Sequence, residues 1–96
     1  MSSEFVKSNH LKRVASVVWK PMKEETILLN TENGAYFSTN DVGLAIWQAC
    51  DGTRSLEDIV IEVADQFKAP LAQIKRDIQS FSGRLQRLGL LETSSR

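Results

Sequence analysis

Cysteine and histidine each occur once in the 96 residues, as Cys50 and His10, and proline occurs only twice. A single cysteine cannot form an intrachain disulfide, and one cysteine with one histidine cannot build a closed zinc site. The only cysteine and histidine pair would have to join a polar N-terminal segment to the end of a predicted helix. We therefore expect no catalytic centre, no metal site and no bound cofactor.

Long apolar runs are also missing from the chain. No run approaches the roughly 18 residues that cross a bilayer, and residues 1–10 (MSSEFVKSNH) lack the apolar core of a signal peptide. The glycines are scattered and form no phosphate-binding loop. The carboxylate pairs at 24–25 and 57–58 are adjacent in sequence, so their members point to different faces. The sequence predicts a cytoplasmic protein that is not an enzyme and does not bind a membrane.

The 12 basic and 12 acidic side chains cancel, but they are unevenly distributed. Residues 1–23 carry five basic and one acidic side chain, residues 24–65 one and nine, and residues 66–96 six and two. A neutral total disfavours nucleic acid as the partner, because such binders usually carry a basic excess that neutralises phosphates. A winged-helix nucleic-acid-binding protein remains the more distant alternative, through the basic last third.

Three segments in the first half have the composition of strands. Residues 14–19 (VASVVW) are rich in β-branched and aromatic side chains and end at Lys20-Pro21, where proline removes a donor. Residues 26–30 (TILLN) and 35–39 (AYFST) flank a polar loop with an Asn-Gly pair, which is typical of a β-hairpin turn. We expect an antiparallel sheet of three strands.

The second half has the pattern of three helices. Asn40 is a good cap for a helix that ends near Cys50, and Ser55 with Asp58 has the spacing of a capping box for a second helix. Pro70 suits the first position of a third helix, which Gly89 would end. The third helix carries the clearest apolar stripe: Leu71, Ile74, Ile78, Phe81, Leu85 and Leu88.

Strands followed by helices define an α+β fold, and this order resembles a winged helix-turn-helix. We expect a flexible N-terminal arm over residues 1–13, one domain over 14–92 and a frayed tail over 93–96. A three-stranded sheet has two edges, and an uncovered edge presents unpaired peptide groups to an extended peptide. Alternatively, the edge pairs only with the same edge of a second copy of the chain. We therefore expect a monomer or a weak dimer.

Four segments together resemble the PqqD-like family: LLNTENGAYF at 28–37, NDVGLAIW at 40–47, DGTRSLEDI at 51–59 and LQRLGLL at 85–91. The likeness covers about residues 14–92. It implies a recognition element of ribosomally made, modified peptides, with a winged helix-turn-helix-like fold. It also implies that a precursor's leader peptide adds an antiparallel strand to the third predicted strand and packs against the third helix. One departure is Thr39, where family members commonly carry leucine.

Carried over by position, the resemblance predicts the peptide-binding residues. The strand contributes Ala35, Tyr36, Phe37 and Ser38, and the third helix contributes Ile74, Asp77, Ile78, Phe81, Arg84 and Leu85. Residues 43–47 are more similar to stand-alone members from lasso peptide pathways than to the peptide chaperone of pyrroloquinoline quinone biosynthesis, which works with a radical enzyme. The implied partners are a leader peptide, a transglutaminase-like leader peptidase and an asparagine-synthetase-like cyclase. The quinone pathway stays open as the alternative.

Overall fold

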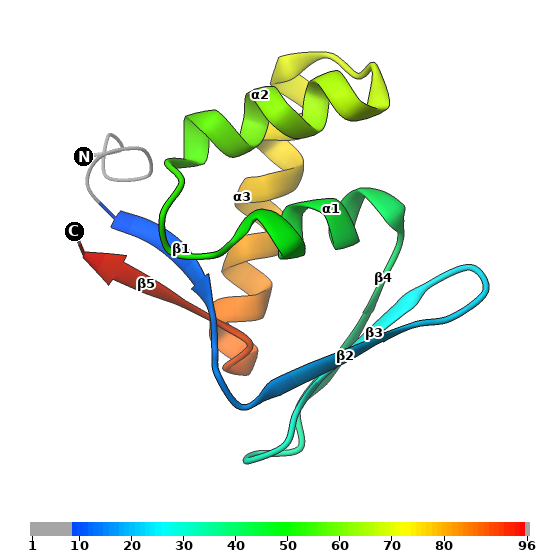
Figure 1. Ribbon diagram of the computed structural model, residues 1–96, viewed down its shortest axis with the longest axis vertical. Helices are drawn as coiled ribbons and strands as arrows, with labels where there is room; N and C mark the ends of the chain where they lie inside the picture. Colours follow the sequence, from blue (N-terminus) through cyan, green and yellow to red (C-terminus); the bar gives the residue numbers. More distant parts are fainter. Residues whose placement is uncertain (1–8, 96) are drawn as a thin grey trace.

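The computed structural model describes residues 9–95, which form eight elements (Figure 1). Three strands, β2 (Val17–Pro21), β3 (Thr26–Asn30) and β4 (Tyr36–Thr39), make an antiparallel sheet in the order β2-β3-β4. Three helices follow: α1 (Asp41–Ala49), α2 (Leu56–Phe67) and α3 (Leu71–Leu88). This confirms the predicted α+β fold, in which a three-stranded antiparallel sheet precedes three helices.

The hairpin between β3 and β4 forms at the Asn-Gly pair, as predicted. Gly34 adopts a φ of +78°, which glycine reaches without steric cost. Its N–H donates to the carbonyl of Asn30, and the Asn30 N–H donates to the carbonyl of Ala35. These bonds set the register that pairs Leu28 with Phe37 and Leu29 with Tyr36.

The first strand of this sheet lies two to three residues later than the sequence predicted. Residues 14–16 form a turn, closed by the Val17 N–H donating to the carbonyl of Val14, and the strand then continues through Pro21. Proline is accepted there because β2 is an edge strand, so its missing N–H removes little from the sheet.

Two further strands, β1 (Asn9–Arg13) and β5 (Leu91–Ser95), pair with each other antiparallel. The predicted flexible arm over 1–13 and frayed tail over 93–96 are therefore wrong for residues 9–13 and 93–95, while residues 1–8 and 96 lie outside the described residues. The physical reason is burial: Leu11 and Leu91 both belong to the core, so pairing the two ends covers apolar surface.

The helix ends largely follow the predicted caps. The side chain of Asn40 accepts from the Gly43 N–H at 2.9 Å, and that of Ser55 accepts from the Asp58 N–H at 3.0 Å. Gly89, with a φ of +80°, ends α3, and the Leu90 N–H folds back to the carbonyl of Leu85 at 2.8 Å. Pro70 differs by one position, because it is the cap of α3 rather than its first helical residue.

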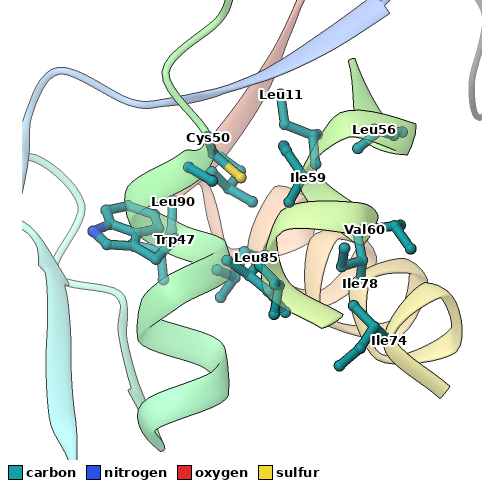
Figure 2. Packing of buried hydrophobic residues seen from close by; sticks show 14 of the residues in the cluster. Leu11, Trp47, Cys50, Leu56, Ile59, Val60, Ile74, Ile78, Leu85 and Leu90 are labelled. Atoms are coloured by element: carbon teal, nitrogen blue, oxygen red, sulfur yellow. The ribbon is translucent and has the colours of Figure 1, made fainter. Parts of the chain in front are cut away.

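The core lies between the helices and one face of the sheet. Figure 2 shows Ile59 and Val60 of α2 facing Ile74, Ile78 and Leu85 of α3, with Trp47 of α1 and Cys50, the residue after α1, beside them. Leu28 is the fully buried contribution of the sheet. Because α3 supplies both core residues and the neighbour of β4, its packing fixes where the sheet edge lies. Among the described residues, no helix is long and apolar enough to span a membrane.

Candidate functional site

The sheet has two edges, at β2 and at β4, and the edge at β4 lies beside α3. In an antiparallel pair, residues alternate between those that exchange hydrogen bonds with the neighbour and those whose peptide groups point away. The Asn30 N–H donates to Ala35, so the pairs that include Phe37 and Thr39 are hydrogen-bonded by alternation. The N–H and C=O groups of Tyr36 and Ser38 therefore point away from β3, toward the open edge.

The side chains of β4 divide between the two faces of the sheet. Tyr36 and Ser38 are exposed on the outer face, and the Tyr36 side chain is 69% exposed. Phe37 is half-buried on the inner face, toward α3. The Ser38 hydroxyl also donates a hydrogen bond to the carboxylate of Glu25, the residue directly before β3. This bond ties the loop between β2 and β3 to the end of β4.

An aromatic and cationic cluster joins β4 to α3. The rings of Phe37 and Phe81 meet edge to face, with 6.0 Å between centroids and an interplanar angle of 80°. The Arg84 guanidinium lies 5.2 Å from the centroid of the Phe37 ring. Both distances fit favourable aromatic and cation–π contacts. The surface beside the free edge is therefore apolar, with one positive charge above it.

The turn after β3 holds the sheet against the end of α3. The Asn30 side-chain amide donates to the carbonyl of Gly89 at 2.8 Å, and its oxygen accepts from the Ser16 hydroxyl at 2.8 Å. The Asn33 amide donates to the carbonyl of Leu88 at 3.3 Å. These bonds also satisfy carbonyls that a helix end leaves free. They fix the separation of β4 and α3 at one end of the site.

The structure brings together only part of the predicted residue set. Ile74, Ile78 and Leu85 are 1%, 0% and 0% exposed, so they lie in the core beneath the site rather than on its surface. Asp77, Phe81 and Arg84 form the neighbouring stripe of α3, at steps of four and three residues. This difference arises because the stripe predicted from the sequence combines two adjacent faces of one helix.

Ala35 is at the margin of the site and its peptide groups are already used. Its N–H donates to the Asn33 side chain at 2.8 Å, and its carbonyl accepts from Asn30. The strand residues with free peptide groups are therefore Tyr36 and Ser38. Ala35 contributes to the turn that positions them.

Gly43 is a positioning residue that the sequence analysis did not single out. A Cβ atom built there would lie 1.7 Å from Thr39 Oγ1 and 3.3 Å from a ring carbon of Phe81. Glycine thus lets the first turn of α1 approach both the end of β4 and the aromatic cluster. It also explains how Thr39 fits at this corner. A glycine within an otherwise helical segment is the signal that points to such a contact.

Arg13 performs a similar structural role at the other end of α1. Its guanidinium donates to the carbonyls of Trp47 at 3.0 Å and Gln48 at 2.7 Å, and lies 5.4 Å from the centre of the Trp19 ring. A cation at a helix C-terminus also opposes the negative end of the helix dipole.

The single cysteine, Cys50, directly follows α1, and burial raises the pKa of its thiol to about 12. The thiol is protonated at neutral pH and is a poor nucleophile.

The fold and site together define a small winged-helix-like α+β domain with an open strand edge beside an amphipathic helix. Residues 25–91 match the family model described as coenzyme PQQ synthesis protein D (PqqD). The chain therefore belongs to the PqqD family.

Two curated relatives are 35% identical to this chain, and both are PqqA binding proteins. The one from Rhizobium meliloti (strain 1021) aligns over 72 residues, which are 75% of this chain and 71% of the relative. The one from Xanthomonas euvesicatoria pv. vesicatoria (strain 85-10) aligns over 69 residues, 72% and 73% of the two chains.

Two solved structures share the fold. TbiB1 in complex with the TbiA(beta) leader peptide superposes with a TM-score of 0.73 at 27% identity, covering 88% of this chain and 99% of that one. Lasso peptide synthetase B1 complexed with the leader peptide superposes with a TM-score of 0.72 at 18% identity, covering 86% and 98%. The second likeness concerns the fold alone.

Proposed function

We propose that this chain is a non-enzymatic protein that captures the leader peptide of a ribosomally made precursor as an extra antiparallel strand along β4. The observation that carries the proposal is the free edge at Tyr36 and Ser38, beside the cluster of Phe37, Phe81 and Arg84. Backbone hydrogen bonds provide affinity in such strand addition, and pockets for alternate side chains provide specificity.

The geometry assigns different tasks to the two faces of the captured strand. The peptide groups of Tyr36 and Ser38 offer four hydrogen bonds to the guest. Every second guest side chain then points to the inner face, onto Phe37 and Phe81, because side chains alternate along a strand. An acidic guest residue near Arg84 would gain a charge-assisted contact at the rim.

The pathway we favour is lasso peptide maturation. In this proposal the protein works in the cytoplasm and delivers the bound precursor to a separate transglutaminase-like leader peptidase and then to an asparagine-synthetase-like cyclase. The solved relative at 27% identity, which covers most of both chains and holds a leader peptide, supports leader capture. The choice of the lasso pathway rests on the resemblance of residues 43–47 to stand-alone members from lasso peptide pathways. The buried, protonated Cys50 supports a division of labour in which the chemistry belongs to other proteins.

A second candidate is a peptide chaperone for pyrroloquinoline quinone biosynthesis. It is favoured by the 35% identity to two PqqA binding proteins. The two candidates use the same edge and differ in the peptide that it accepts. The identity of the bound peptide therefore distinguishes the two candidate functions.

Fluorescence anisotropy with three labelled probes tests the proposal. The probes are a leader peptide from a short precursor frame sought beside this protein's gene, a PqqA peptide and a DNA duplex, at physiological salt. We expect saturable binding of the neighbouring leader and no measurable binding of DNA. Tight DNA binding without leader binding would refute peptide capture, and a clear preference for the PqqA peptide would move the protein to the quinone pathway.

A further inference from the structure

A hollow of about 430 Å³ opens between α2 and α3. Two of the residues that line it, Leu56 and Val60, are buried in the core, whereas Ile61 and Leu71 are 58% and 56% exposed. Leu71 belongs to the apolar stripe predicted for the third helix, yet the structure leaves it outside the core cluster. Exposed apolar side chains grouped around a hollow are typical of a surface that contacts another protein.

The hollow and the β4 edge lie on different faces of α3. Leu71 and Lys75 line the hollow, whereas Phe81 and Arg84 contact Phe37 of β4. Arg84 follows Lys75 by nine residues, which is about two and a half helical turns, so the two side chains leave α3 on opposite sides. A molecule bound at the hollow therefore leaves the β4 edge open.

The two helices beside the hollow carry opposite charge. α2 has four acidic side chains and no basic one, and α3 has four basic side chains and one acidic one. At the hollow itself the two signs are represented by Glu57 and Lys75. Within residues 9–95, neither of these side chains forms an ion pair. One surface thus combines projecting apolar side chains, a hollow and charges of both signs.

This combination makes the surface complementary to itself. In a dimer with two-fold symmetry, the same surface of both copies meets, so each contact between two residues occurs twice. A two-fold axis along the hollow places the acidic α2 of each copy over the basic α3 of the other. An axis across the hollow would place α2 over α2, where like charges repel. The charges therefore select a single orientation of the second copy.

We propose that the hollow between α2 and α3 is the interface of a symmetric dimer, in which Ile61 and Leu71 of each copy pack against the other copy and Glu57 of each copy pairs with Lys75 of the other. The inference goes beyond the proposed function and does not rest on it. The occupant is a second copy because the surface offers both charges in matched positions, whereas a partner of one sign would leave one of them opposed. Both β4 edges stay open in such a dimer.

Sedimentation velocity over a series of protein concentrations measures the dimer, after thermal unfolding has shown that each variant is folded. Glu57→Lys and Lys75→Glu should each weaken the dimer at least about tenfold, because each reversal places like charges opposite one another at both symmetric contacts. Ile61→Gln removes the apolar contact twice and should weaken it by a similar factor. The control is Arg76→Glu, which reverses a neighbouring charge of α3 that does not line the hollow and should change the Kd by less than about twofold.

A mixture of the two reversed proteins is the decisive measurement. When Glu57→Lys protein meets Lys75→Glu protein, both contacts again join opposite charges, so a heterodimer should form with a Kd within about threefold of the wild-type value. Glu57 lies in the first turn of α2, so its reversal also costs some helix stability. Recovery on mixing depends on the contact between copies and cannot arise from either protein's own stability.

The outcomes distinguish this interface from other arrangements. A wild-type protein that stays monomeric at every concentration would overturn the inference, as would full association of the single variants or no recovery on mixing. An equal loss in Arg76→Glu would mean that overall charge alone governs association. Ser38→Pro, which removes an outward N–H at the β4 edge, should leave the dimer unchanged; its loss would show that the copies pair through their strands. Failure of leader binding would count against the proposed function alone.

Discussion

Substitution of Ser38 by proline tests the free edge of β4 without breaking the hydrogen bonds inside the sheet. The Ser38 N–H points away from β3, because the pair of Ser38 with Ile27 is the type that exchanges no hydrogen bonds. Proline at this position removes that outward donor without breaking a bond inside the sheet, which is the placement that edge strands tolerate. The fold should survive while peptide capture is lost.

The expected loss follows from the bond and from the group left behind. The net contribution of a hydrogen bond is about 0.5–1.5 kcal/mol. A carbonyl of the bound peptide that is left without its donor beside β4 costs about 1–3 kcal/mol. Because the cost of the unsatisfied carbonyl already includes the lost bond, we expect a loss of about 1–3 kcal/mol, or roughly 5- to 150-fold in Kd. Stability should fall by about 1 kcal/mol at most, because the exposed bond between Ser38 and Glu25 is the main contact that is lost.

Fluorescence anisotropy with the leader peptide measures the affinity, and thermal unfolding measures the stability. Ser38→Ala is the matched control, because it removes the hydroxyl but keeps the N–H, and it should bind within about twofold of wild type. Amide hydrogen exchange adds a residue-level check: Tyr36 and Ser38 should gain protection on binding, while Phe37 is protected in both states. Wild-type affinity in a folded Ser38→Pro variant would refute the assigned edge and register.

Three further predictions follow from other contacts. Arg84→Glu should lower the affinity for an acidic leader at least about fivefold while the melting temperature changes little. Arg76→Glu, on another exposed face of α3, should leave that affinity unchanged, and equal losses would mean that only the overall charge matters. Gly43→Ala should lower the free energy of unfolding by about 1–3 kcal/mol in urea titrations, with partial recovery on adding Thr39→Ala; wild-type stability would refute the close contact. Because burial raises the pKa of Cys50 from 9.0 to about 12, its contribution to stability should be lost as pH rises through that range, and native protein should resist thiol labelling at pH 8 until urea is added; rapid native labelling would contradict the burial.

Local signals were sufficient for the helices and for the hairpin. The cap at Ser55 and the stop at Gly89 depend on residues within one turn, and the Asn-Gly turn needs only its own backbone freedom. Such preferences act over four or five residues, so the sequence predicts them without knowledge of the rest of the chain. The edge strand was also predictable, because a three-stranded sheet must have edges.

Contacts between distant residues were the part that could not be predicted. β1 and β5 pair across about 80 residues of chain, and this pairing places both Leu11 and Leu91 in the core. Neither strand has a turn signal or a strong alternation of its own. The close contact of Gly43 with Thr39 is likewise a property of two packed elements, not of either one alone.

The division of α3 into two neighbouring stripes decides how recognition can vary. Ile74, Ile78 and Leu85 face the core, so changes there alter folding first and binding only through it. Asp77 and Arg84 are exposed on the next stripe, where Arg84 lies over the half-buried Phe37 ring, whereas the half-buried Phe81 serves both tasks. Charge at positions 77 and 84 can therefore be changed to suit a different leader at little cost to stability, which makes these two positions the places to alter when specificity is redesigned.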